Sequence, residues 1–196
     1  AGTWDADLVT RIQSVLRLAK ASGLRIVEVD AIQRAIGVAF DPAQTTTGNS
    51  ILEACAELTA LRGDYPDIEL AELLSWFGNL DLLAWDAGTA PYYNRAVRPD
   101  ALPAAFAWAA IESPSTPVSL GSVSSELAGV LRVATATMPR LFAAADSIPD
   151  PELKDLNLAS LSKLFRICSL ARAAGYEVAE FLELARIVGL DLTVLD

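Results

Sequence analysis

The sequence predicts an all-α protein, an array of about eight helices built from repeated helix-turn-helix pairs. Apolar residues recur at three- and four-residue steps along most of the chain, and no useful length alternates with period two. Glycine or proline follows most of these segments, as expected where helices end. Hydrophobic residues make up 53% of the 196 residues, so the chain has enough apolar surface to bury a core. We expect a single α-helical domain over residues 1–196.

The first two predicted helices form a pair near residues 5–37. The first helix has one apolar stripe and ends at Gly23, and the shorter second helix runs from Ile26 to Ile36 and ends at Gly37. Each glycine stands where a left-handed C-terminal cap is needed. The stripe of the first helix contains Trp4, Leu8, Ile12, Val15, Leu16 and Ala19.

A polar segment separates this pair from the third helix. Residues 41–49 include three consecutive threonines and predict a loop. Ser50 and Glu53 have the spacing of a capping box, in which each side chain accepts a hydrogen bond from the other's backbone N–H. We therefore expect the third helix to begin at Ser50, to run to about Arg62 and to stop at Gly63.

The fourth helix is expected between Asp67, a candidate N-cap, and Gly78. Near residues 79–100 the helical pattern breaks, which predicts a long loop, and loops of this length are often functional. Four of its side chains are a candidate interaction site that could clamp a phosphate or a sugar: Tyr92, Tyr93, Arg95 and Arg98. Anchoring of the loop against the helices or a neighbouring subunit is the favoured alternative.

The fifth helix, residues 102–112, is almost wholly apolar and is expected to be central. After a Ser/Pro-rich segment, a sixth helix is expected over residues 125–145. Pro139 should kink or divide this helix, because proline removes a donor and crowds the preceding turn. Asp150 followed by Pro151 is a candidate N-terminal cap.

The last two predicted helices span residues 158–174 and 178–188 and end at Gly175 and Gly189. This pair, near residues 158–189, repeats the first: residues 9–38 align with 161–190 without a gap. Residues 51–78 resemble a weaker third copy. Repeated helical pairs usually stack into scaffolds. Identical pairs are Leu18/Leu170, Ala19/Ala171, Ala21/Ala173, Gly23/Gly175, Glu28/Glu180, Arg34/Arg186 and Gly37/Gly189.

Composition excludes several kinds of function. With 25 acidic and 15 basic residues the formal charge is −10, so we expect no nucleic acid partner. The chain has no histidine, which excludes Ser-His-Asp and Cys-His catalysis and His-ligated metals and leaves any pH response to other titratable groups. Cys55 and Cys168 are expected to be buried and too few for a zinc site. We expect no catalytic residue, cofactor or metal.

Two weaker patterns have competing interpretations. Ser160 and Lys163 have the Ser-x-x-Lys spacing of a lysine-activated nucleophile, but a helix N-terminal turn is favoured. An acidic run is favoured as a solvated face over a site for acid–base chemistry or a hard cation. The alternative function is a small all-helical ligand-binding domain or enzyme that uses this acidic face and the Tyr/Arg loop. The run consists of Glu53, Glu57, Asp64, Asp67, Glu69 and Glu72.

The order of motifs resembles the A subunits of bacterial Tc (toxin complex) insecticidal toxins. Residues 158–166, Leu-Ala-Ser-Leu-Ser-Lys-Leu-Phe-Arg, and 170–175, Leu-Ala-Arg-Ala-Ala-Gly, are similar to that family's "Asn-Leu-Ser-x-Leu-Tyr-Arg, Leu-Ala-Arg-Ala-x-Gly" block. Residues 12–36 resemble an earlier helix-pair block, and residues 73–81 fit between the two. The loop at residues 91–97 keeps one aromatic residue of the family's pattern but lacks its later phenylalanine.

The resemblance implies a non-enzymatic structural module in the α-helical shell of a secreted or surface-bound toxin. Such A subunits are large, form pentamers and build a channel that delivers a toxic enzyme held by companion subunits. The implied partners are other regions of the same chain, neighbouring A subunits, those companions and a host surface receptor. The only methionine is Met138, so we also expect a fragment or processed product of a longer chain. A module of this kind should expose apolar patches, whereas a ligand-binding domain should have one deep pocket with convergent polar groups.

Overall fold

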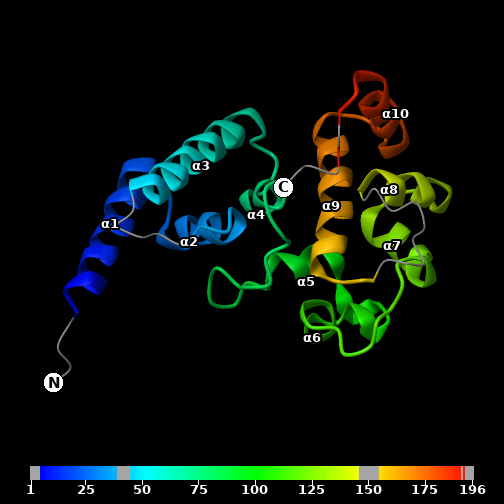
Figure 1. The fold of residues 1–196 in the computed structure, drawn as a ribbon, viewed down its shortest axis with the longest axis horizontal. Helices are drawn as coiled ribbons and strands as arrows, with labels where there is room; N and C mark the ends of the chain where they lie inside the picture. Colours follow the sequence, from blue (N-terminus) through cyan, green and yellow to red (C-terminus); the bar gives the residue numbers. More distant parts are fainter. Residues whose placement is uncertain (1–4, 39–44, 146–154, 191, 193–196) are drawn as a thin grey trace. The chain divides into compact units, whose positions relative to one another are not determined.

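The computed structural model describes residues 5–38, 45–145, 155–190 and 192, and over these ranges the protein is all-α, as predicted (Figure 1). The described residues form ten α-helices and four short 3₁₀ turns, with one isolated β-bridge between Ser119 and Asp155. The chain divides into two compact units, Ala1–Gly78 and Asn79–Asp196. Each unit contains one of the repeated helix pairs. No helix in the described ranges combines the length and apolar character needed to cross a bilayer.

The N-terminal unit consists of α1 (Ala6–Ser22), α2 (Ile26–Ala35), α3 (Thr45–Asp64) and α4 (Leu70–Leu74). The long helix α3 packs against α1, α2 and α4, and α2 also contacts α4. The apolar stripes meet between these helices, as amphipathic helices require. The core includes Leu18, Ala19, Leu24, Val29, Ala31, Ile32, Ile51, Cys55, Leu58, Leu70, Ala71, Leu73 and Leu74.

The predicted start of the third helix is wrong. Helix α3 begins at Thr45, so the end of the predicted loop is helical and Ser50 lies inside the helix, where it cannot form an N-terminal capping box with Glu53. Threonine costs only a few tenths of a kcal/mol per helical position, which packing elsewhere along the same helix can offset. Gly63 is also helical, because α3 ends at Asp64.

The fourth helix is shorter than predicted. Its N-cap is Glu69 rather than Asp67, and it ends at Leu74. Gly78 does not cap it; instead, a Cβ atom placed on Gly78 would lie 2.5 Å from the carbonyl oxygen of Ala35. This glycine therefore permits a close backbone approach to the end of α2.

The C-terminal unit is built around α9 (Leu158–Ala173), which contacts α7 (Ser124–Leu131), α8 (Met138–Ala145) and α10 (Val178–Val188). Figure 1 shows these three helices along one side of α9. Helix α9 is buried around most of its circumference, which makes it the centre of the unit. Its buried residues are Ser160, Leu161, Ser162, Leu164, Phe165, Arg166, Ile167, Cys168, Ser169 and Ala171.

The prediction of a central helix over residues 102–112 is wrong. A 3₁₀ turn at Ala104–Phe106 is followed by α6 (Trp108–Glu112), and Ala107 between them is extended, with ψ 145°. Only Phe106 and Ile111 are buried in this segment. Its apolar character comes mainly from alanine, whose small side chain gains little free energy from burial. The hydropathy of the segment therefore predicts more burial than the structure shows.

The predicted sixth helix is divided, as expected, but not at Pro139. The break comes earlier, where Arg132 adopts a left-handed conformation with φ 58° and a 3₁₀ turn follows at Thr135–Thr137. Pro139 is the second residue of α8, where a missing N–H costs no helical hydrogen bond. The N-cap predicted at Asp150 and Pro151 lies outside the described residues.

The two repeated pairs share their backbone hydrogen bonds at equivalent positions. The N–H of Leu24 donates to the carbonyl of Ala19 at 3.1 Å, and that of Tyr176 donates to Ala171 at 2.9 Å. The N–H of Leu190 likewise donates to Ala185 at 2.8 Å, as Val38 does to Gln33 at 3.1 Å in the first pair. These are the six-to-one bonds of Schellman caps. The glycines at the caps have positive φ: Gly23 70°, Gly37 65°, Gly175 77° and Gly189 70°.

Candidate functional site

The two tyrosines of the candidate interaction loop are buried. The expected loop over residues 79–100 contains an unexpected short helix, α5 (Tyr92–Val97). The Tyr93 hydroxyl donates a hydrogen bond of 2.6 Å to the carbonyl of Phe106, and burial raises the pKa of Tyr93 to about 12. The Tyr92 ring packs edge-on against Phe165 of α9, with ring centroids 6.0 Å apart. Both side chains therefore fix the segment to the helical core.

The two arginines of the loop lie on its exposed side. The Arg95 guanidinium stacks over the Tyr92 ring at 5.4 Å, and its Nε donates to the carbonyl of Ala90 at 3.1 Å. Arg98 is the left-handed C-cap of α5, with φ 55°. The four residues thus form a short anchored helix with two solvent-facing cations, rather than a cage of side chains open to a ligand.

Asp81, not among the candidate residues, organises the chain before α5. Its carboxylate accepts a hydrogen bond of 2.6 Å from the Trp85 indole and one of 2.9 Å from the backbone of Leu83. Its carbonyl accepts from the N–H of Tyr93 at 3.0 Å. An aspartate two and four residues before its donors is the sequence signal that could have revealed this turn.

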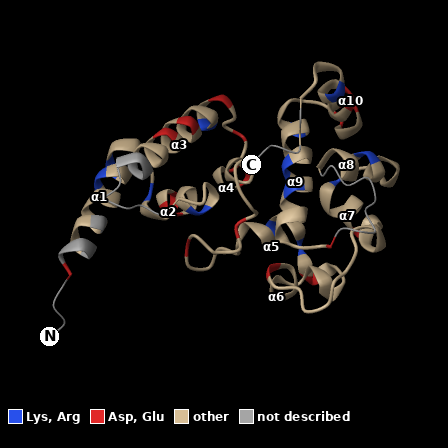
Figure 2. Cartoon of the chain, viewed as in Figure 1, with Lys and Arg blue, Asp and Glu red and all other residues tan. Residues whose placement is uncertain are grey.

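The acidic run is distributed over α3, α4 and the turn between them. Figure 2 shows acidic positions on α3, and every member except the half-buried Glu72 is exposed. Within the described ranges no three acidic or cysteine side chains converge as a metal site would require. Among the described residues of this unit the buried carboxylate is instead Glu28, which lies 3.4 Å from the Nε of Arg25 and 3.9 Å from the Nη1 of Arg62.

Ser160 forms a helix cap. Its backbone N–H donates to the Asn157 side chain at 2.9 Å, and its hydroxyl oxygen accepts from the Asn157 N–H at 3.0 Å. This reciprocal pair is the capping box of α9. The same hydroxyl lies 2.9 Å from the carbonyl of Asp155, so it is held by the chain's own backbone. The helix-start interpretation of Ser160 and Lys163 agrees with this geometry.

Both cysteines are buried, as predicted, and both are free thiols. Burial raises the pKa of the Cys168 thiol to about 12, against the smaller opposing effect of Arg172, and it also raises the pKa of Cys55. Thiols with raised pKa values are poor nucleophiles because the thiolate is scarce at neutral pH. Cys55 lies in the N-terminal unit and Cys168 in the C-terminal unit.

A shallow groove of about 390 Å³ lies between α8 and α10. Its floor is apolar, and its two basic residues, Arg140 and Arg186, both contact Glu183, at 3.0 and 2.6 Å. The hydrogen bond from Arg186 is the main reason that the pKa of Glu183 is lowered. The apolar floor includes Leu182, Ala185, Leu190 and Leu192.

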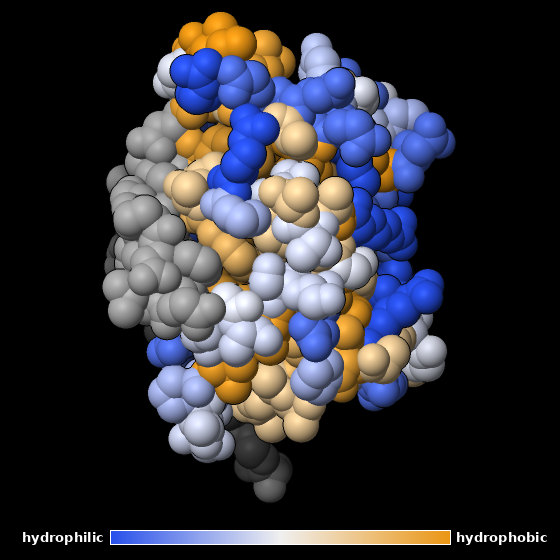
Figure 3. Space-filling model, turned by 90° about the vertical axis from the view of Figure 1, so that its right-hand side faces the viewer, coloured by the Kyte–Doolittle hydropathy of each residue, from blue (hydrophilic) through white to orange (hydrophobic). Residues whose placement is uncertain are grey.

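Apolar side chains are also exposed on the repeated pairs. Figure 3 shows hydrophobic side chains at the top of the face in view, where Figure 1 places α10. Among the described residues, the exposed large aliphatic side chains of the pairs are Ile12, Leu16, Ile26, Leu184, Ile187, Val188 and Leu190. Contiguous exposed apolar surface usually marks an interaction site.

Comparison of this chain with protein-family models, with curated proteins and with solved structures found no match.

Proposed function

We propose that this chain is a structural and assembly module of the α-helical shell of a Tc-type toxin A subunit. The shell of such a protein surrounds a channel that delivers a toxic enzyme, and the module contributes packing surface rather than chemistry. The order of motifs along the chain supports the family, and the all-α fold agrees with it.

One observation supports the structural role above the others. Both helix pairs expose apolar side chains at positions where a neighbouring helix can pack. Burying a large aliphatic side chain is worth about 1.5–3 kcal/mol, so each such surface favours association with another element. Other regions of the toxin chain and further A subunits would provide these neighbours in a secreted or surface-bound assembly.

The tyrosines weigh against the alternative function. A ligand-binding Tyr/Arg loop needs its aromatic faces accessible, but Tyr93 is fully buried and Tyr92 nearly so. The Tyr93 hydroxyl bonds to Phe106, and the Tyr92 ring contacts Arg95 and Phe165 of α9, all within the same unit. These contacts support the anchoring interpretation of residues 92–98.

An antibody raised against this chain tests the proposal. The native cell and culture fractions are separated by size under native and denaturing conditions and probed with it. We expect the antibody to detect a polypeptide several times larger than the 20.8 kDa of this chain, in a pentameric particle visible by electron microscopy. Detection of a monomeric polypeptide of the chain's own mass would overturn the proposal.

A further inference from the structure

The second helices of the two pairs, α2 and α10, bury opposite faces. In α2, Ile32 is fully buried at 0% exposure and Ile36 is half-buried, because α3 and α4 pack on this face. The equivalent residues of α10, Leu184 and Val188, are 39% and 66% exposed. Ala35 and Val38 are likewise half-buried. Their equivalents Ile187 and Leu190 complete the exposed set, and we name Leu184, Ile187, Val188 and Leu190 the α10 apolar face.

The opposite face shows the reverse difference. Leu164 and Val178 of the second pair are 1% and 6% exposed, because α8 packs against both α9 and α10. Their equivalents in the first pair, Ile12 and Ile26, are 42% and 52% exposed. Each pair therefore has two apolar faces. In the C-terminal unit one face is covered by α8, which precedes the pair in the sequence. In the N-terminal unit the other face is covered by α3 and α4, which follow the pair.

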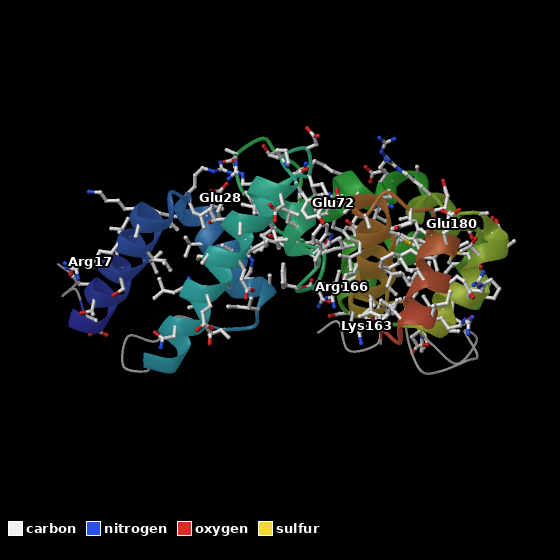
Figure 4. The ribbon with its side chains drawn as sticks, turned by 90° about the horizontal axis from the view of Figure 1, so that it is seen from above. Arg17, Glu28, Glu72, Lys163, Arg166 and Glu180 are labelled. Carbon is white, nitrogen blue, oxygen red and sulfur yellow. The ribbon has the colours of Figure 1, made fainter. Side chains whose placement is uncertain are left out.

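The surroundings of an equivalent glutamate also differ between α2 and α10. Glu28 and Glu180 are equivalent, and each accepts a hydrogen bond from the backbone N–H three residues earlier, at 2.7 and 3.4 Å. Figure 4 labels both. Glu28 is buried and lies 3.9 Å from Arg62 in the last turn of α3. Glu180 is exposed, and within the described ranges no cation lies within 4.0 Å of its carboxylate.

We infer that the α10 apolar face is the docking surface for an amphipathic helix with the chemistry of α3. That helix has apolar side chains with the i, i+4, i+7 spacing of Ile51, Cys55 and Leu58, which form the buried stripe of α3. It has an arginine in its last turn that reaches Glu180, as Arg62 reaches Glu28. The partner is thus a further helix of the same repeat type, docked in the same register. This inference deepens the structural part of the proposed function and names the kind of partner.

The test appends a second copy of residues 39–78 after Asp196, so that a tethered helix of known chemistry is offered to α10. The longer tether adds less than about 1 kcal/mol of closure entropy. Hydrogen exchange is measured on the full chain with and without the copy. We expect the α10 amides to exchange about tenfold more slowly when the copy is present. Equal exchange rates would overturn the inference.

Matched variants identify the surface. Ile187→Glu should abolish the added protection, whereas Leu83→Glu, at an exposed leucine in the segment before α5, should leave it. Glu180→Arg or Arg62→Glu in the appended copy should each weaken the protection, and the two together should restore it. Protection that survives Ile187→Glu would contradict the inference. The antibody experiment does not involve α10 docking, so failure of this inference and failure of the proposed function are distinguishable.

Discussion

At the scale of single residues, the chain fixes its least regular segment with buried polar contacts. Tyr93 illustrates this, since its ring is fully buried and its hydroxyl satisfies the carbonyl of Phe106 at the end of a 3₁₀ turn. A buried carbonyl without a donor costs free energy comparable to a lost hydrogen bond. The hydroxyl therefore joins α5 to the segment before α6.

Tyr93→Phe removes this hydrogen bond and leaves the ring in place. We expect the free energy of unfolding to fall by about 1–2 kcal/mol, because the Phe106 carbonyl loses its donor. Urea denaturation followed by circular dichroism measures the change. Tyr176→Phe, at an exposed tyrosine, is the matched control and should change stability by less than about 0.5 kcal/mol. Equal effects of the two substitutions would contradict the assigned role.

The same residue predicts a response to alkaline pH. Burial raises the pKa of Tyr93 to about 12, whereas an unfolded tyrosine titrates near 10. Between these values the unfolded chain releases the phenolic proton and the folded chain retains it. The contribution of Tyr93 to the free energy of unfolding is therefore fully present below pH 10 and is lost toward pH 12. We expect wild type to lose more stability than Tyr93→Phe over this range. Cys168 titrates similarly in both proteins, so its contribution cancels in the difference. Parallel curves would contradict the expectation.

At the scale of helices, glycine has two different roles. Gly23 and Gly175 supply the positive φ of the caps, whereas Gly78 supplies space beside Ala35. Gly63 has neither role, because it is helical and a Cβ atom there meets nothing within 4 Å.

Substituting alanine for Gly78 and for Gly63 should therefore have opposite effects on stability. Gly78→Ala should destabilise the protein by about 1–3 kcal/mol, because the added carbon meets a backbone oxygen that cannot move away alone. Gly63→Ala should stabilise it by up to about 1 kcal/mol, through the better helix propensity of alanine. Thermal unfolding of both variants measures the difference. A neutral Gly78→Ala would contradict the close approach of Gly78 to the end of α2.

Helices with both an apolar stripe and a glycine cap were predictable from the sequence. The bounds of α1, α2, α9 and α10 agree with the predictions to within about three residues, because local periodicity and left-handed glycines determine these elements. The prediction of a central helix over residues 102–112 was wrong because hydropathy does not distinguish small alanines from side chains large enough to hold a helix in the core. The predicted start of α3 was wrong because packing outweighed the weak preference of the threonines for a loop.

The candidate site was only partly predictable. The aromatic and basic residues at 92–98 were found from composition, and the favoured interpretation, anchoring against the helices, agrees with their burial. Asp81 was missed because its role depends on backbone geometry in a turn. The difference between the α2 and α10 faces was also missed, because the alignment of the two copies was read for its matches. The mismatches carry the signal, since Leu182 and Ala185, buried in α10, replace Asp30 and Gln33 of α2.

At the scale of the whole molecule, repetition explains both the fold and the exposed apolar surface. A repeat unit of two helices cannot bury its apolar faces alone, so neighbours on both sides are needed. Each pair in this chain has a neighbour on one face only among the described residues. The central claim is that the chain is one part of a longer stack of such pairs.

Cryo-electron microscopy of the assembly that the antibody isolates from the native source tests this claim most directly. We expect the map to show a helix packed along the α10 apolar face, with a basic side chain beside Glu180, and a second helix covering Ile12 and Ile26. A map in which this chain is resolved and both surfaces face solvent would contradict the claim.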